Sequence, residues 1–114
     1  MIWFKDGVRI KRYSKAIHKI LSVLNSIESV HDDDWPTEIF ITSINDSQHG
    51  VGSKHYKDMA IDVRSKNFPS RQAKDRFVKF IADTLGENYT VLFENEGTDN
   101  EHYHIQVRKG LVIL

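Results

Sequence analysis

The chain has 114 residues, 39% of them hydrophobic, with 16 basic and 16 acidic residues and no cysteine. This length fits one domain, residues 1–114, that can bury a core of its own. The balanced charge argues against a nucleic-acid partner or an anionic membrane surface, and the absence of cysteine excludes disulfides and thiolate metal sites.

The first elements predicted along the chain are a hairpin and a helix. Residues 2–4 and 8–10 flank the turn signal Asp6-Gly7, which favours a small β-hairpin. From Ser14, a typical N-cap residue, apolar residues recur three and four positions apart as far as Ile27. This spacing predicts a helix of about four turns with one face on the core.

The middle of the chain predicts two strands joined through a polar segment. Residues 38–44 are β-branched and aromatic, which favours a strand, and the polar residues 45–52 favour a loop. Apolar and polar residues then alternate from Met59 to Arg64. This pattern predicts a strand that turns Ile61 to the core and Asp62 to the opposite face.

The C-terminal part predicts a helix and two further strands. An amphipathic helix runs over residues 73–85 and ends before Gly86, and a strand covers residues 89–93. Residues 94–100 form a polar loop. In the last strand, polar His102, His104, Gln106 and Arg108 alternate with apolar Tyr103, Ile105 and Val107. We therefore expect an α+β fold in which two helices pack on one face of an antiparallel sheet.

The polar face of this sheet contains residues that suit a metal ion. A catalytic zinc site takes three protein ligands and leaves one position for water, and His55, Asp62 and His104 supply that number. Glu101 is the candidate general base that takes a proton from the attacking water. His102 shares a strand face with His104 and is the alternative candidate catalytic residue. We expect Zn²⁺ as the cofactor.

Two motifs also carry a resemblance to a known family. They are Ser53-x-His55-x-x-x-x-Ala60-x-Asp62 and Glu101-x-x-His104. Together they resemble the signature of bacterial and phage zinc D-alanyl-D-alanine carboxypeptidases and L-alanyl-D-glutamate endopeptidases, and the order of elements agrees over residues 37–108. The resemblance implies a hedgehog/DD-peptidase-like fold, the same three zinc ligands, the same glutamate base and peptidoglycan stem peptides as substrate.

The chain differs from the family pattern around the substrate-binding turn. The family usually has glycine at the position of Asp58, and its Gly-Tyr-Arg-like turn, whose arginine helps to bind substrate, corresponds here to residues 43–46, which contain no arginine. We therefore expect Ser53 and Arg64 to bind substrate, with Lys54 as a further candidate.

Two functions are compatible with these motifs. The first is a zinc peptidase that degrades the cell wall, such as an endolysin-like phage enzyme, and the second is a non-catalytic zinc-containing binding module of the same fold. The apolar start at residues 1–4 is too short for a signal peptide and no later segment could span a bilayer. We expect synthesis in the cytoplasm, action on the wall after release, and neither nucleic acid nor membrane as a partner.

Overall fold

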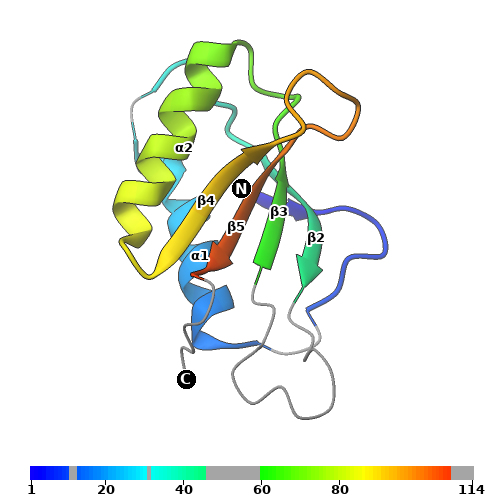
Figure 1. Cartoon of the computed structure of the whole chain (residues 1–114), viewed down its shortest axis with the longest axis vertical. Helices are drawn as coiled ribbons and strands as arrows, with labels where there is room; N and C mark the ends of the chain where they lie inside the picture. Colours follow the sequence, from blue (N-terminus) through cyan, green and yellow to red (C-terminus); the bar gives the residue numbers. More distant parts are fainter. Residues whose placement is uncertain (11–12, 31, 46–59, 109–114) are drawn as a thin grey trace.

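The computed structural model describes residues 1–10, 13–30, 32–45 and 60–108 (Figure 1). In chain order, the elements of this part are β1 (Ile2–Phe4), α1 (Lys15–Asn25), a 3-10 turn η1 (Ser26–Ser29), β2 (Ile39–Asn45), β3 (Ala60–Arg64), α2 (Arg71–Leu85), β4 (Tyr89–Glu94) and β5 (His102–Val107). The predicted α+β class is confirmed, and so are both predicted helices and five of the six predicted strands.

The strands form one five-stranded sheet in the order β1-β2-β3-β5-β4. β2, β3, β5 and β4 pair antiparallel with their neighbours, as predicted, but β1 pairs parallel with β2, so the sheet is mixed. The predicted N-terminal hairpin is wrong, because Ile2 lies opposite Ile39 and residues 8–10 are not a strand. An isolated two-stranded hairpin is marginally stable, whereas a strand added to an existing sheet shares its core.

Side-chain caps begin both helices. The hydroxyl of Ser14 accepts a hydrogen bond from the backbone N–H of Ile17 at 3.1 Å, and that of Ser70 accepts one from Ala73, also at 3.1 Å. Gly86, with a φ of 89°, follows the last residue of α2 in a conformation that favours glycine. Ser14 and Gly86 confirm the predicted start of α1 and end of α2. Neither helix is long and apolar enough to cross a membrane.

The core lies between the two helices and one face of the sheet (Figure 1). Its centre is Tyr103 of β5, a fully buried residue whose ring contacts those of Phe68, Phe77 and Phe93. Further buried members are Ile17, Ile20, Leu24, Ile39, Ile41, Ile61, Val63, Ile81 and Ile105. These apolar contacts lie on the face of the sheet away from its polar side chains.

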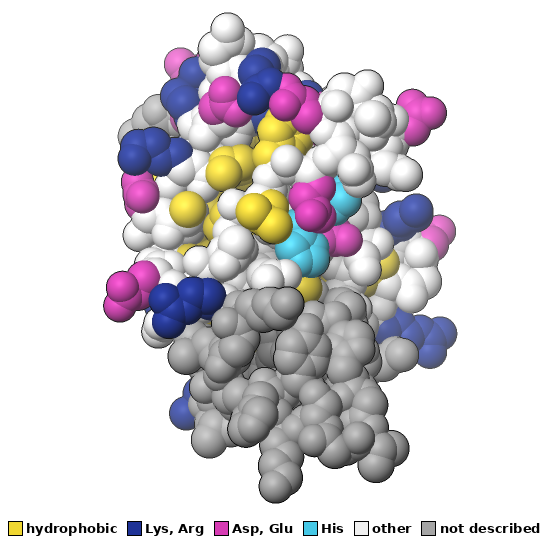
Figure 2. All heavy atoms as spheres, in the orientation of Figure 1, with side chains coloured by type: hydrophobic (Ala, Val, Ile, Leu, Met, Phe, Trp, Pro, Cys, Tyr) yellow, Lys and Arg dark blue, Asp and Glu magenta, His cyan; other side chains and the backbone are white. Residues whose placement is uncertain are grey.

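The other face of the sheet carries the polar side chains, as the alternation in β3 and β5 predicts. Along β5, partly exposed His102, His104 and Gln106 alternate with buried residues, and Asp62 is the partly exposed residue in the middle of β3. Acidic and histidine side chains gather in one group on this face (Figure 2). The fold therefore separates a buried apolar face from a solvent-facing polar one.

Candidate metal centre

Strand register brings four ionisable side chains together on the polar face. Asp62 of β3 lies directly opposite His104 of β5, and Glu94 of β4 lies directly opposite His102 of β5. Directly opposed residues in an antiparallel pair have Cβ atoms roughly 4.5–5.5 Å apart, so their side chains can touch. We call these four residues the Asp–His cluster.

His104 makes two short contacts within or beside this cluster. Its Nδ1 lies 2.7 Å from Asp62 Oδ1, and its Nε2 lies 2.7 Å from the Oε1 of Gln106. An amide oxygen only accepts, so Nε2 donates its proton to Gln106 and Nδ1 faces the carboxylate. Burial alone lowers the pKa of His104. Its hydrogen bonds to Gln106 and Asp62, and the charges of Asp62 and Glu94, outweigh burial and raise the pKa above its ordinary value.

His102 is oriented in a similar way from the beginning of β5. Its Nδ1 lies 2.6 Å from the backbone oxygen of Asn100, which can only accept, so Nδ1 is the donor in that contact. Its Nε2 then points to the two carboxylates, at 3.0 Å from Glu94 Oε1 and 3.8 Å from Asp62 Oδ1.

The ligand types and their convergence suit a divalent metal ion. One ligand atom from each of Asp62, His102 and His104 can be chosen so that all three lie within 4.8 Å of one another. The side chains are 28%, 21% and 22% exposed, so an ion could reach them from solvent. Imidazole nitrogen and carboxylate oxygen are usual zinc ligands, and a metal-binding histidine usually donates its other N–H to an oxygen, as His104 does to Gln106. The residues present fit zinc.

The structure brings together two of the three predicted metal ligands. Asp62 and His104 are in contact, and the predicted alternative base His102 lies beside them. The third predicted ligand, His55, lies outside the described residues, and so do Ser53 and Lys54, which were predicted to contact substrate. Their predicted roles stay predictions.

Glu101, the predicted general base, lines the cavity next to Asp62 and His102, but its carboxylate is bonded to residues outside the Asp–His cluster. Its Oε1 accepts hydrogen bonds from Ser65 Oγ and Lys74 Nζ, both at 2.6 Å, and its Oε2 accepts one from the backbone N–H of Gly97 at 2.9 Å. Within the described chain these are its polar partners. Burial alone raises the pKa of Glu101, but Lys74, Ser65 and Gly97 together lower it to about 2. Its role as general base stays a prediction. In the structure its carboxylate forms an ion pair with Lys74.

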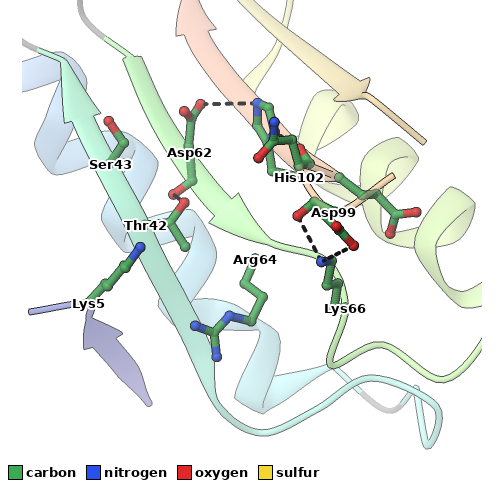
Figure 3. A pocket seen from close by; sticks show the side chains of 10 residues that line it. Lys5, Thr42, Ser43, Asp62, Arg64, Lys66, Asp99 and His102 are labelled. Carbon is green, nitrogen blue, oxygen red and sulfur yellow. Dashed lines mark hydrogen bonds and ion pairs between the residues drawn. The ribbon is translucent and has the colours of Figure 1, made fainter. Parts of the chain in front are cut away.

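A cavity of about 570 Å³ adjoins the cluster at Asp62 and His102 (Figure 3). Its lining also includes the cations Lys5, Arg64 and Lys66. The Arg64 guanidinium stacks over the Phe40 ring, with the guanidinium carbon 4.9 Å from the ring centre. The predicted substrate-binding residue Arg64 therefore lies in a cavity beside the candidate metal ligands.

Two of the three cations in this cavity have no acidic partner in the described part of the chain. Lys66 donates a hydrogen bond to the backbone oxygen of Asp99 at 2.8 Å and lies 3.9 Å from its carboxylate. Lys5 and Arg64 make no ion pair with a described residue. The carboxylates of Asp62, Asp99 and Glu101 also line the cavity, so its unpaired positive charge is confined to Lys5 and Arg64, where an anionic group would be favoured.

Sequence reasoning missed two residues at this site. Glu94 was placed in a loop, but β4 continues through it, and Gln106 was assigned to the polar face without a role. Thr90 and Leu92 alternate with neighbours that face the core. If this alternation is continued by two residues, it places Glu94 on the same face as the histidines.

Comparisons with known proteins identify no relative. No family model matches the chain, and no curated protein or solved structure is significantly similar to it. The motifs of the chain and the geometry of the polar face are therefore the indications of its function.

Proposed function

We propose that this protein is a zinc-dependent peptidase of hedgehog/DD-peptidase-like fold that hydrolyses peptide bonds in peptidoglycan stem peptides. The observation that carries the proposal is the contact between Asp62 and His104. Each belongs to one of the two family-like motifs, they are 42 positions apart, and Nδ1 of His104 lies 2.7 Å from Oδ1 of Asp62. The resemblance of the motifs supplies the reaction and the substrate class.

In this proposal Asp62, His104 and His55 hold the ion. Zinc in such a site acts as a Lewis acid and lowers the pKa of water from 15.7 to about 7. Gln106 contributes by accepting the Nε2 proton of His104, which keeps Nδ1 available as the ligand atom. Asp62 and His104 are partly buried on neighbouring strands, so the sheet holds them in position before an ion arrives.

Proton transfer has two candidate residues, Glu101 and His102. The His102 Nε2 faces the cluster and is 3.8 Å from Asp62 Oδ1, so it needs no rearrangement to approach the reacting groups. Glu101 would first have to leave Lys74 and Ser65. The geometry therefore favours His102, whereas the motif resemblance favours Glu101.

The cationic wall of the adjoining cavity gives the substrate a second point of attachment. A stem peptide has carboxylates on its D-glutamate and terminal D-alanine residues. Arg64, held against Phe40, and Lys5, which lines the same cavity (Figure 3), can bind one of them while the neighbouring peptide bond lies near Asp62 and His102. This arrangement supplies the positive charge that the missing arginine of the family turn would provide.

A non-catalytic zinc-containing binding module is the second candidate. The observation that favours it is the ion pair between Lys74 and Glu101, because a carboxylate held in this way is not available to move protons. In this alternative the cluster and the cationic wall bind a peptide without cleaving it.

Digestion of purified peptidoglycan tests the proposal. The zinc-loaded protein should release stem-peptide fragments detectable by mass spectrometry, and Asp62→Asn or His104→Gln should abolish their release. Loss of the general base should lower turnover on the order of 10²-fold, so His102→Gln and Glu101→Gln, each assayed at saturating zinc, identify which residue has that role. If the protein binds zinc and peptidoglycan but releases no fragment, the binding-module alternative is correct.

A further inference from the structure

Each histidine of the Asp–His cluster has one ring nitrogen hydrogen-bonded to an oxygen outside the cluster, as metal-binding histidines usually do. His104 donates from Nε2 to the side-chain oxygen of Gln106, and His102 donates from Nδ1 to the backbone oxygen of Asn100. Each ring therefore has one nitrogen whose proton is committed to an oxygen outside the cluster. Histidines that bind metal ions usually have this second contact, because it sets the tautomer and the direction of the ligating nitrogen.

The other ring nitrogen of each histidine lies near one carboxylate oxygen of Asp62 and one of Glu94. Asp62 Oδ1 lies 2.7 Å from His104 Nδ1 and 3.8 Å from His102 Nε2. Glu94 Oε1 lies 3.0 Å from His102 Nε2 and 3.8 Å from His104 Nδ1. Tetrahedral ligands at about 2.0–2.1 Å from a zinc ion are about 3.3 Å apart, which lies within this range of separations. Ligand atoms of Asp62, His102 and His104 already lie within 4.8 Å of one another, and Glu94 Oε1 would join them if its side chain rotated toward Asp62.

Charge and rigidity favour the same arrangement. With both rings neutral, the cluster has two negative charges within a partly buried group, and a divalent cation neutralises both. The four residues come from three adjacent strands whose register pairs Glu94 with His102 and Asp62 with His104. Ligands on paired strands are held more precisely than ligands on loops.

We infer that Glu94 and His102 join Asp62 and His104 as ligands of one divalent cation, so that the sheet alone completes the site. This inference rests on the metal site of the proposed function but changes its ligand set, because the ion is retained without His55. Four protein ligands are typical of a closed zinc site, whereas three leave a position for water. With all four residues bound, the ion would have no open position, and hydrolysis would need Glu94 or His102 to give way to water.

Metal titration of matched variants tests this ligand set independently of any activity. Zn²⁺ affinity is measured by competition with a chromophoric chelator, and Co²⁺ absorption reports the coordination. The variants are His55→Ala, Glu94→Gln and His102→Gln. Glu96→Gln is the control, because Glu96 lies two residues from Glu94 and pairs with Arg71 rather than with the cluster.

We expect His55→Ala and Glu96→Gln to bind one ion with nearly unchanged affinity, and Glu94→Gln and His102→Gln to lose on the order of 100-fold or more, since even partners outside the ligand shell cost about 10- to 100-fold. The Co²⁺ spectrum should change in the same two variants. If His55→Ala loses the ion while Glu94→Gln retains full affinity, the inference is overturned and the ligand set of the proposed function stands. A loss in His55→Ala equal to that in Glu94→Gln also overturns it. If the unmodified protein binds no divalent ion, both assignments fall.

Discussion

The Nζ atom of Lys74 lies 2.6 Å from Oε1 of Glu101, and this ion pair ties the start of β5 to helix α2. The side chains are 17% and 8% exposed, so the pair is largely removed from water. Glu101, which the motif predicts to be catalytic, therefore also has a structural contact. Its structural role and its catalytic role can be separated by measuring stability and zinc binding in the same variant.

We expect Glu101→Gln to lower the free energy of unfolding by about 3 kcal/mol, because it leaves the Lys74 ammonium largely buried without a counter-charge. Urea unfolding measures the change, and zinc affinity should stay the same. Glu96→Gln is the control, because its ion pair with Arg71 is exposed and should contribute at most about 1 kcal/mol. Equal stability of the two variants would leave Glu101 free for catalysis.

The same carboxylate should make stability sensitive to acid. The pKa of Glu101 is about 2 in the folded protein, against an ordinary value of 4.5. Its contribution is therefore complete above about pH 4.5 and is lost as the pH falls from there toward 2, since the unfolded chain takes up the proton first. The urea midpoint of the unmodified protein should fall more steeply over this interval than that of Glu101→Gln. Parallel curves would contradict the assignment.

Tyr103→Phe should stabilise the protein by about 1 kcal/mol. The hydroxyl of Tyr103 is buried and has no hydrogen-bond partner in the described chain, so its removal relieves an unsatisfied polar group while the ring keeps its aromatic contacts. Burial, with smaller contributions from the charges of Glu101 and Asp75, raises the pKa of this phenol, so it stays protonated. Thermal unfolding checks the sign. Tyr13→Phe, at an exposed position, should show no such gain.

Gln106→Ala should weaken zinc binding on the order of tenfold without unfolding the protein. Gln106 holds the Nε2 proton of His104, and without it the ring can rotate or change its tautomer. Thr90 lies directly opposite Gln106 in β4, so Thr90→Ala is a control with the same strand context. Isothermal titration with Zn²⁺ measures both. Equal affinity of the two variants would mean that the Gln106 contact does not orient the ligand.

Removal of metal should leave the protein folded. The apolar core is built from helix residues and the opposite face of the sheet, so it does not depend on the Asp–His cluster. Far-ultraviolet circular dichroism after chelation should retain its helical signal. Zinc at about 100 times its Kd should then raise the unfolding free energy by about 2.7 kcal/mol. A random-coil spectrum after chelation would show that the fold depends on the ion.

The sequence alone determined both helices, most of the strands and the two faces of the sheet. Apolar spacing predicted α1 and α2, and alternation predicted that Asp62 and His104 lie on the face away from the core. These properties are local, because the period of a helix or strand and the choice of a capping residue such as Ser14 depend on neighbours in the chain.

Only the tertiary structure decided which residues meet. The parallel pairing of β1 with β2, the position of Glu94 opposite His102 and the ion pair of Glu101 with Lys74 join segments that are far apart in the chain or belong to different elements. No periodicity specifies such contacts, because they depend on strand order, on register and on the helix that covers each part of the sheet. Packing of α2 against the sheet placed Lys74 beside Glu101. Strand register placed Glu94 beside His102.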